Sequence, residues 1–151
     1  MKICSFFGHR DVEITDELYA TATAEILNSV ALGCRVFYFG EYGSFDRLCY
    51  YVVTNIMKEH PELGISRIYC VAQEKYLRKR IRYFNPNDYD DVIYLEPRIE
   101  WWYKSIYYRN LAMIDKSDCV IFYVEERANS GAYKAYKYAI QKKGKRVVNL
   151  F

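Results

Sequence analysis

No stretch of this sequence is long and apolar enough to cross a membrane, and this absence excludes a protein that spans a membrane with helices. Such a helix needs about 18 or more consecutive apolar residues, and charged residues interrupt every apolar run well before that length. No signal-peptide pattern precedes the first predicted strand, which begins at Lys2. We therefore expect a cytoplasmic protein.

The five cysteines contain no C-x-x-C pair, and their number is odd and their spacing irregular. This pattern argues against both a zinc site and a disulfide framework. Four of the five lie inside predicted strands, where cysteine behaves as a small buried hydrophobic residue. We expect no disulfide, no metal site and no cofactor, with five free thiols at Cys4, Cys34, Cys49, Cys70 and Cys119.

Internal repeats, low-complexity segments and linkers are also missing from the chain. Its 151 residues, 52% hydrophobic and 27% charged, are typical of one soluble globular domain, and we predict a single domain over 1–151. The net charge of +3 indicates no particular partner. Aromatic residues reach 18%, mostly tyrosine, which suits half-buried strands and interfaces.

Acidic residues are absent from the end of the chain. Between Arg127 and Phe151 there are seven Lys or Arg residues and no Asp or Glu. This imbalance could attract an anion, or the lysines near 142–145 could be the solvated end of a last helix. A second basic run, over 78–82, leaves contact with nucleic acid open as an alternative.

Short, nearly continuous apolar runs recur along the chain and predict strands that are buried on both faces of a parallel sheet. The predicted strands are Lys2–Phe7, Cys34–Phe39, Arg67–Ala72, Val92–Leu95, Cys119–Val124 and Arg146–Leu150.

Helical periodicity fills most of the intervals between these strands. Thr15 is a candidate N-cap for a first helix with apolar Leu18, Ala22, Ile26, Leu27 and Val30, which ends at Gly33. A second helix is capped by Ser44 and ends near Pro61. A third covers 104–116 with Ile106, Met113 and Ile114 inward, and a fourth begins near Ser130 and buries Ala132, Ala135, Ala139 and Ile140.

Strands that alternate with helices of this length predict an α/β fold. We expect a single Rossmann-like domain, with a mostly parallel sheet of five or six strands and helices on both faces. The segment 74–100 contains prolines and many charged residues, and we expect it to be partly irregular.

Three loops that follow predicted strands contain glycine, and ligands of open α/β sheets bind at this edge. Two of the loops lead into helix N-termini, whose free N–H groups suit phosphate. We therefore expect Gly8, Gly40 and Gly131 to border one pocket. The candidate ligand-binding residues in these loops are Gly8, His9, Arg10, Gly40, Glu41, Gly43, Ser44, Phe45, Asp46, Ser130, Gly131 and Ala132.

Three side chains of these loops have specific candidate roles. His9 could act as a general acid or base, or it could hold its loop by a backbone hydrogen bond. Arg10 offers a planar fork of donors for phosphate. Asp46 could accept hydrogen bonds from ribose hydroxyls, or it could stabilise the positive end of its own helix dipole.

Four segments in order resemble the SLOG superfamily, which includes the DNA-processing protein DprA and the Lonely Guy enzymes. They are Phe6-Phe7-Gly8-His9-Arg10, Gly40-x-x-Gly43-x-Phe45-Asp46, Arg109-Asn110-x-x-Met113-Ile114-Asp115-x-x-Asp118 and Ser130-Gly131-Ala132. The YpsA-like branch is the most similar one. The resemblance covers essentially the whole chain and implies binding of a nucleotide or nucleotide derivative, and a homodimer.

The resemblance adds Arg109 and Asn110 to the candidate ligand-binding residues, because the Lonely Guy enzymes have an active-site arginine at the position of Arg109. We expect this arginine to face a phosphate and to have no structural partner within the protein. The alternative is a structural ion pair with Asp115 or Asp118 across a helix turn.

The glutamate with which the Lonely Guy enzymes split the base–ribose bond has no counterpart here. Its position falls on Ala135, and no acid occurs from Arg127 onward. Because cleavage through an oxocarbenium-like state needs a nearby carboxylate, binding or sensing is favoured over catalysis. One alternative is a phosphoribohydrolase that uses Glu41, Asp46, Asp115 or Asp118, of which the last two flank a helix end and look structural. The other alternative is a DprA-like DNA-binding protein.

Overall fold

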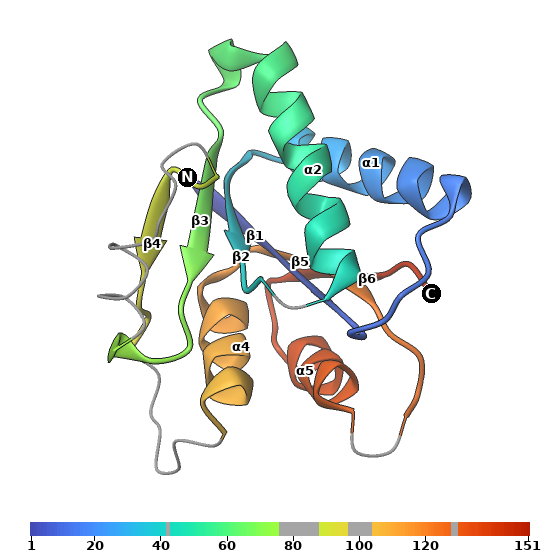
Figure 1. Cartoon of the computed structure of the whole chain (residues 1–151), viewed down its shortest axis with the longest axis vertical. Coiled ribbons are helices and arrows are strands. Elements are labelled where there is room, and N and C mark those ends of the chain that lie inside the picture. Colours follow the sequence, from blue (N-terminus) through green and yellow to red (C-terminus); the bar gives the residue numbers. More distant parts are fainter. Residues whose placement is uncertain (42, 76–87, 97–103, 128–129) are drawn as a thin grey trace.

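The computed structural model describes residues 1–41, 43–75, 88–96, 104–127 and 130–151. Within these ranges, six strands form one parallel sheet in the order β4-β3-β2-β1-β5-β6 (Figure 1). This sheet confirms the predicted α/β fold class. The strands are β1 (Lys2–Gly8), β2 (Cys34–Phe39), β3 (Ser66–Cys70), β4 (Asp91–Ile93), β5 (Cys119–Tyr123) and β6 (Arg146–Asn149).

Four α-helices in the described ranges cover the two faces of the sheet (Figure 1). Helices α1 (Asp16–Ala31) and α2 (Ser44–Glu59) pack against each other on one face. Helices α4 (Ser105–Lys116) and α5 (Gly131–Ile140) pack together on the other face. A 3₁₀-helix, η1 (Pro61–Leu63), follows α2. In the described ranges no helix is of the length and apolarity that a membrane crossing requires.

The core has two parts, one on each side of the sheet, because successive strand residues point to opposite faces. In β1, Cys4 and Phe6 belong to the part under α1 and α2, while Phe7 belongs to the part under α4 and α5. Phe6 stacks against Phe37 and Phe39 of the neighbouring strand β2. Burial of each such ring contributes about 1.5–3 kcal/mol to folding.

The helix starts follow the predicted capping chemistry at one helix and depart from it at another. Thr15 caps α1, and its hydroxyl accepts the Leu18 N–H at 3.1 Å. The predicted cap of α2 at Ser44 is wrong, since Gly43 occupies the N-cap position with φ of 95°. The Ser44 hydroxyl instead donates to the Val12 carbonyl at 2.6 Å, which ties α2 to the loop after β1.

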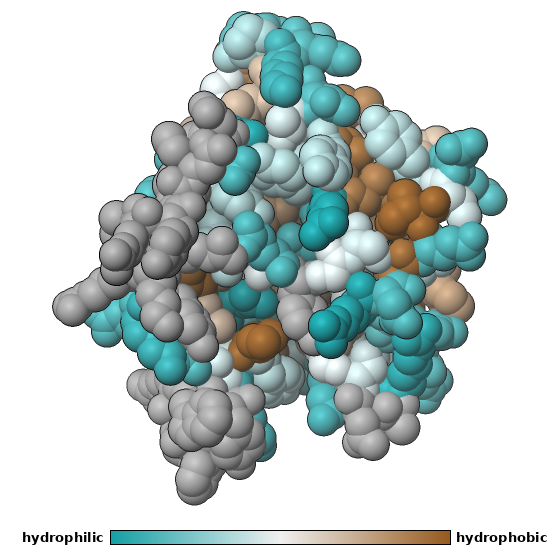
Figure 2. Space-filling model, in the orientation of Figure 1, coloured by the Kyte–Doolittle hydropathy of each residue, from teal (hydrophilic) through white to brown (hydrophobic). Residues whose placement is uncertain are grey.

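Two apolar residues that the helical periodicity placed inward are exposed, Ile106 of α4 and Ile140 of α5, and Leu27, an apolar residue of α1, is exposed as well. The buried stripe of α4 includes Arg109 and Met113, four residues apart, and Ile106 lies off that stripe. Ile140 is the last residue of α5, whose buried residues are Ala135 and Ala139. Figure 2 shows apolar surface gathered over α1, where Leu27 lies.

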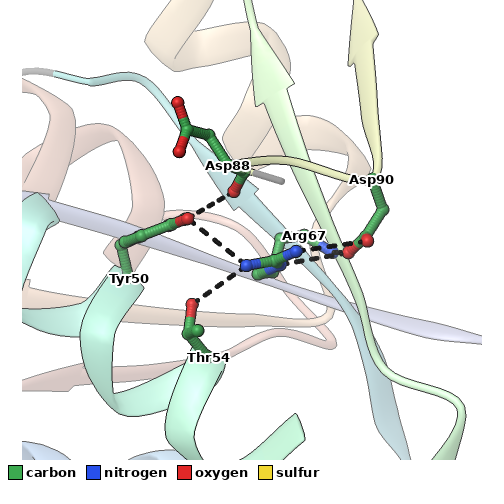
Figure 3. Close-up of polar contacts among 5 residues, drawn as sticks. All are labelled: Tyr50, Thr54, Arg67, Asp88 and Asp90. Atoms are coloured by element: carbon green, nitrogen blue, oxygen red, sulfur yellow. Dashed lines mark hydrogen bonds and ion pairs between the residues drawn. The ribbon is translucent and has the colours of Figure 1, made fainter. Parts of the chain in front are cut away.

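A buried arginine connects the edge of the sheet to α2 (Figure 3). Arg67 of β3 pairs with Asp90 at 3.2 Å, and its Nη1 donates to the hydroxyls of Tyr50 and Thr54 on α2. The Tyr50 hydroxyl in turn donates to the Asp88 carbonyl. This network anchors the chain that leads into β4. Much of the predicted irregular segment, residues 76–87 and 97–100, lies outside the described residues.

Candidate functional site

A cavity of about 570 Å³ lies at the carboxyl edge of the sheet, where β1, β2 and β5 end and α4 and α5 begin. Gly8, Gly40 and Gly131, which were expected to border one pocket, all line it. The other lining residues are Phe6, Phe7, His9, Arg10, Asp11, Asp46, Lys104, Ile106, Tyr107, Arg109, Asn110, Arg127, Ser130 and Ala132.

Close packing explains why two of these three positions are occupied by glycine. A Cβ atom on Gly8 would lie 2.7 Å from the Cβ of Phe45, and one on Gly40 would lie 2.7 Å from Nη2 of Arg109. Real Cβ atoms do not approach neighbours this closely, so a side chain at position 8 would displace Phe45 and one at position 40 would displace Arg109. Gly131 is different, because a Cβ there meets nothing within 4 Å among the described residues.

Arg109 is a buried residue of the cavity wall, with 4% of its surface exposed. Its Nη1 donates to the carbonyl oxygens of Gly40 at 3.0 Å and Cys70 at 3.3 Å, and its Nε and Nη2 donate to Oδ1 of Asn110. The expectation that Arg109 has no structural partner is therefore wrong. Burial lowers the pKa of its guanidinium from the ordinary value, although arginine stays charged in proteins.

The predicted alternative for Arg109, an ion pair with Asp115 or Asp118, is also wrong. Asp118 accepts the Ile3 N–H through Oδ2 at 2.9 Å. Asp115 accepts the Tyr138 hydroxyl and pairs with Lys142. Both aspartates thus have structural roles near the end of α4, away from the cavity lining.

Asp46 holds the turn that follows β2. Its carboxylate oxygens accept the N–H groups of Gly40 at 3.3 Å and Glu41 at 3.1 Å. Glu41 has a φ of 54°, a left-handed conformation that is strained for a residue with a side chain. Burial raises the pKa of the Asp46 carboxyl to about 7, against the opposing effects of the Gly40 N–H and the Arg109 charge.

His9 links the loop after β1 to the loop after β5 and to the start of α5. Its Nε2 accepts the Glu125 N–H at 2.9 Å, and its Nδ1 lies 3.2 Å from the Ser130 hydroxyl, which caps α5 by accepting the Tyr133 N–H. A neutral ring with its proton on Nδ1 satisfies both contacts. Burial, and then the charge of Arg127, lower the pKa of His9. These contacts support the interpretation of His9 as a residue that holds its loop.

Cationic side chains enter the cavity wall from separate segments. Arg10 follows β1, Lys104 precedes α4 and Arg127 precedes α5, where it pairs with Glu125. The sequence interpretation missed Lys104, Tyr107 and Arg127 as lining residues. The position of Lys104 at the predicted start of a helix after a strand is a signal that could have identified it.

Four of the predicted site residues do not line this cavity: Glu41, Gly43, Ser44 and Phe45. Glu41 and Gly43 line a second cavity of about 280 Å³, which Asp46 also borders. Phe45 is fully buried and packs under Gly8.

No group of three or more His, Cys, Asp or Glu residues within the described ranges is arranged to hold a metal ion. In comparisons with known proteins, no family model matches the chain, and no curated protein is significantly similar to it. The resemblance to the SLOG superfamily thus remains a prediction from four motifs.

Proposed function

We propose that the cavity at the carboxyl edge of the sheet binds a nucleotide or a nucleotide-derived phosphate ligand. The observation that carries this proposal is the environment of Arg109. Its side chain is almost fully buried in the cavity wall, yet it forms no ion pair with any carboxylate in the described part of the chain. A buried charge is costly unless it is paired, and a bound anion would supply the partner.

The other charges of the cavity favour an anion as well. Arg10, Lys104 and Arg127 join Arg109 in the lining, against the carboxyl groups of Asp11 and Asp46. The first turn of α5 borders the same space with the positive end of its dipole. A concave site with an excess of positive charge concentrates anions.

The size and the apolar part of the cavity suit the rest of a nucleotide. Small-molecule sites usually measure about 300–1,000 Å³, and this cavity measures about 570 Å³. Phe6, Phe7, Ile106 and Tyr107 contribute apolar and aromatic surface to it. These side chains could cover a base or a sugar while the cations hold a phosphate.

A phosphoribohydrolase is the second candidate, and the observation that favours it concerns Asp46. Its carboxyl group borders the cavity and has a pKa of about 7, which suits a general acid or base at neutral pH. However, both carboxylate oxygens already accept backbone N–H groups. Since no acid follows Glu126 in the sequence, α5 brings no second carboxylate, and we favour binding over hydrolysis.

DNA binding, the third alternative, receives less support from the contacts at the end of the chain. The Lys145 ammonium donates to the carbonyl oxygens of Asp115 and Ser117, and Lys142 pairs with Asp115. These contacts favour the interpretation of the C-terminal lysines as structural cations near the end of α4. The basic run 78–82 lies outside the described residues.

Isothermal titration calorimetry with AMP, CMP, GMP and UMP tests the proposal, with the matching nucleosides as phosphate-free controls. We expect at least one monophosphate to bind and its nucleoside to bind at least about tenfold more weakly. High salt should reduce this difference in affinity, because it screens the charge of the phosphate. Chromatography of the same mixtures should show no free base. Absence of binding by every nucleotide would refute the proposal, and sustained release of free base would replace it with the hydrolase.

A further inference from the structure

We infer that the outward face of α1 is a docking surface for α1 of a second copy of this chain, with the two helices antiparallel. The outward face consists of Ala20, Ala24, Leu27 and Ala31, which are all exposed and recur at intervals of four, three and four residues. This spacing places them along one side of the helix. None of these residues lines the cavity at the carboxyl edge, so the docking surface is independent of the proposed ligand.

Residues 18–31 of α1 expose no charged side chain. The exposed residues of this stretch are Tyr19, Ala20, Thr21, Ala24, Leu27, Asn28 and Ala31. Its one charged residue, Glu25, is half-buried and pairs with Arg146 at 3.0 Å. Other helices of the protein differ, since α2 exposes Arg47 and α5 exposes Lys134. A helix face that meets only water usually carries charged residues, so the outward face of α1 has the composition of a face that contacts protein.

Apolar side chains beside the outward face enlarge the surface that a second copy could cover. Leu27 is 46% exposed within the face, Tyr19 is 42% exposed near the start of α1, and Leu32 is 48% exposed just after its end. Figure 2 shows the apolar surface that gathers over α1. Exposed apolar residues are ordinary when they are scattered singly, whereas a group of them on one element indicates a contact surface.

The charges at the two ends of α1 identify the occupant as a second copy. Asp16 and Glu17 are exposed at the start of the helix. Two cations lie at its other end, because the Lys2 side chain lies beside Gly33 and Arg35 donates to a carbonyl oxygen of the last turn at 2.8 Å. Antiparallel pairing brings the acids of each copy to the cations of the other. It also sets the positive end of each helix dipole beside the negative end of the other.

The alanines of the outward face permit two helices to approach closely. In a pair related by a two-fold axis, both copies use the same face, and Leu27 of each copy would pack between alanines of the other. Small residues at the contact place the helix axes at the short end of the usual range of about 8–10 Å. A membrane surface fits this face less well, because helices that lie on membranes usually carry Lys or Arg on their polar side, and α1 contains neither.

Sedimentation velocity in low-salt buffer measures whether the chain dimerises. A single helix pair buries less area than a standard interface, so we expect a monomer–dimer equilibrium with a Kd of about 1–100 µM. A series of protein concentrations from about 1 to about 500 µM covers this range. High salt should raise the Kd, because it screens the charges at the ends of the two helices.

A matched pair of substitutions tests whether α1 is the surface that pairs. Leu27→Lys places a charge in the outward face of both copies and should raise the Kd at least about tenfold. Ile140→Lys makes the same change at a residue of α5 that is 54% exposed, and it should leave the Kd within about twofold of the wild type. Thermal unfolding of both variants establishes that each is folded at the temperature of the measurement.

Charge reversal tests the antiparallel arrangement. Glu17→Lys and Lys2→Glu, made separately, would each set like charges against one another and should raise the Kd at least about threefold. The double variant restores opposite charges between the copies and should return the Kd to within about twofold of the wild type. In a parallel pair, Glu17 of one copy would lie beside Glu17 of the other, and the second substitution could not restore the affinity.

Three results would overturn the inference. The first is a wild-type protein that stays monomeric at about 500 µM, including one that sediments with phosphatidylcholine vesicles, since the face would then belong to a membrane contact. The second is a dimer that Ile140→Lys weakens as much as Leu27→Lys does, because the copies would then meet through another surface. The third is a double charge variant that dimerises no better than the two single variants.

Discussion

Arg109 on α4 and Gly40 after β2 form a direct contact across 69 residues of sequence: the Arg109 Nη1 donates to the Gly40 carbonyl at 3.0 Å. The contact depends on the absence of a side chain at position 40, because a Cβ there would lie 2.7 Å from Nη2. The same guanidinium donates to the Cys70 carbonyl. One buried cation thus joins the ends of β2 and β3 to α4 and sets the shape of the cavity wall.

Gly40→Ala should destabilise the protein by about 1–3 kcal/mol, because the added methyl group pushes the Arg109 guanidinium away from its acceptors. Urea unfolding followed by circular dichroism measures the change. Gly131→Ala is the matched control, since its Cβ meets no described atom within 4 Å and should cost under about 0.5 kcal/mol. Equal stability of the two variants would contradict the packing argument.

Arg109→Lys should lower stability by about 1–3 kcal/mol, although it keeps the positive charge. A lysine cannot replace the planar fork, and it leaves the carbonyl groups of Gly40 and Cys70 without this donor. Nucleotide affinity should fall in the same variant by about tenfold or more. Thermal unfolding without ligand measures the effect on stability. Calorimetry at a temperature where the variant is folded measures the effect on affinity. A variant with unchanged melting temperature would show that the contacts to the two strand ends contribute little.

The ionisation of Asp46 should make stability fall as the pH rises from about 4 to about 7. Its pKa is raised from 3.8 to about 7 by burial, so in this window the native state holds a proton that the unfolded state has lost. The effect is on the order of a few kcal/mol. His9, whose pKa is lowered, acts in the opposite direction, since its contribution is lost as the pH falls.

Comparison of the wild type with Asp46→Asn separates the effect of Asp46 ionisation on stability from the effect of His9 ionisation. The variant loses one acceptor for the turn and is therefore less stable at every pH, but it has no group at position 46 to titrate. The difference in unfolding free energy between wild type and variant should shrink between pH 4.5 and pH 7.5. A constant difference across this range would mean that Asp46 titrates with an ordinary pKa.

All five thiols should be unreactive in the native protein and free after denaturation. Each cysteine is buried, with between 0% and 3% of its surface exposed. A thiol reagent such as Ellman's should therefore react slowly in buffer and should titrate five thiols in guanidinium without reductant. A count below five in freshly purified protein would reveal a disulfide and contradict the structure.

Much of the fold follows from local patterns in the sequence. The apolar runs that begin at Lys2 and Cys34 form strands, and Thr15 caps α1 as its spacing from Leu18 predicts. Strand and capping preferences act between residues close together in the chain. The convergence of the strand-end glycines also follows, because all parallel strands end at one edge.

The errors occur where the environment of a residue depends on distant segments. The periodicity of α4 and α5 placed Ile106 and Ile140 inward, but the neighbouring helix and the sheet determine which face is covered. Ser44 has the chemistry of a cap, yet the Val12 carbonyl, which lies 32 residues away in sequence, takes its hydroxyl proton.

The sequence by itself therefore determined the elements of this protein and the edge of the sheet at which a site would form. The tertiary structure alone decided the strand order, the cations that share one cavity, and the partners of Arg109, Asp46 and His9. The physical reason is the distance along the sequence over which each kind of interaction acts. Backbone preferences act over a few residues, whereas burial, desolvation and hydrogen bonding depend on which segments the sheet brings into contact.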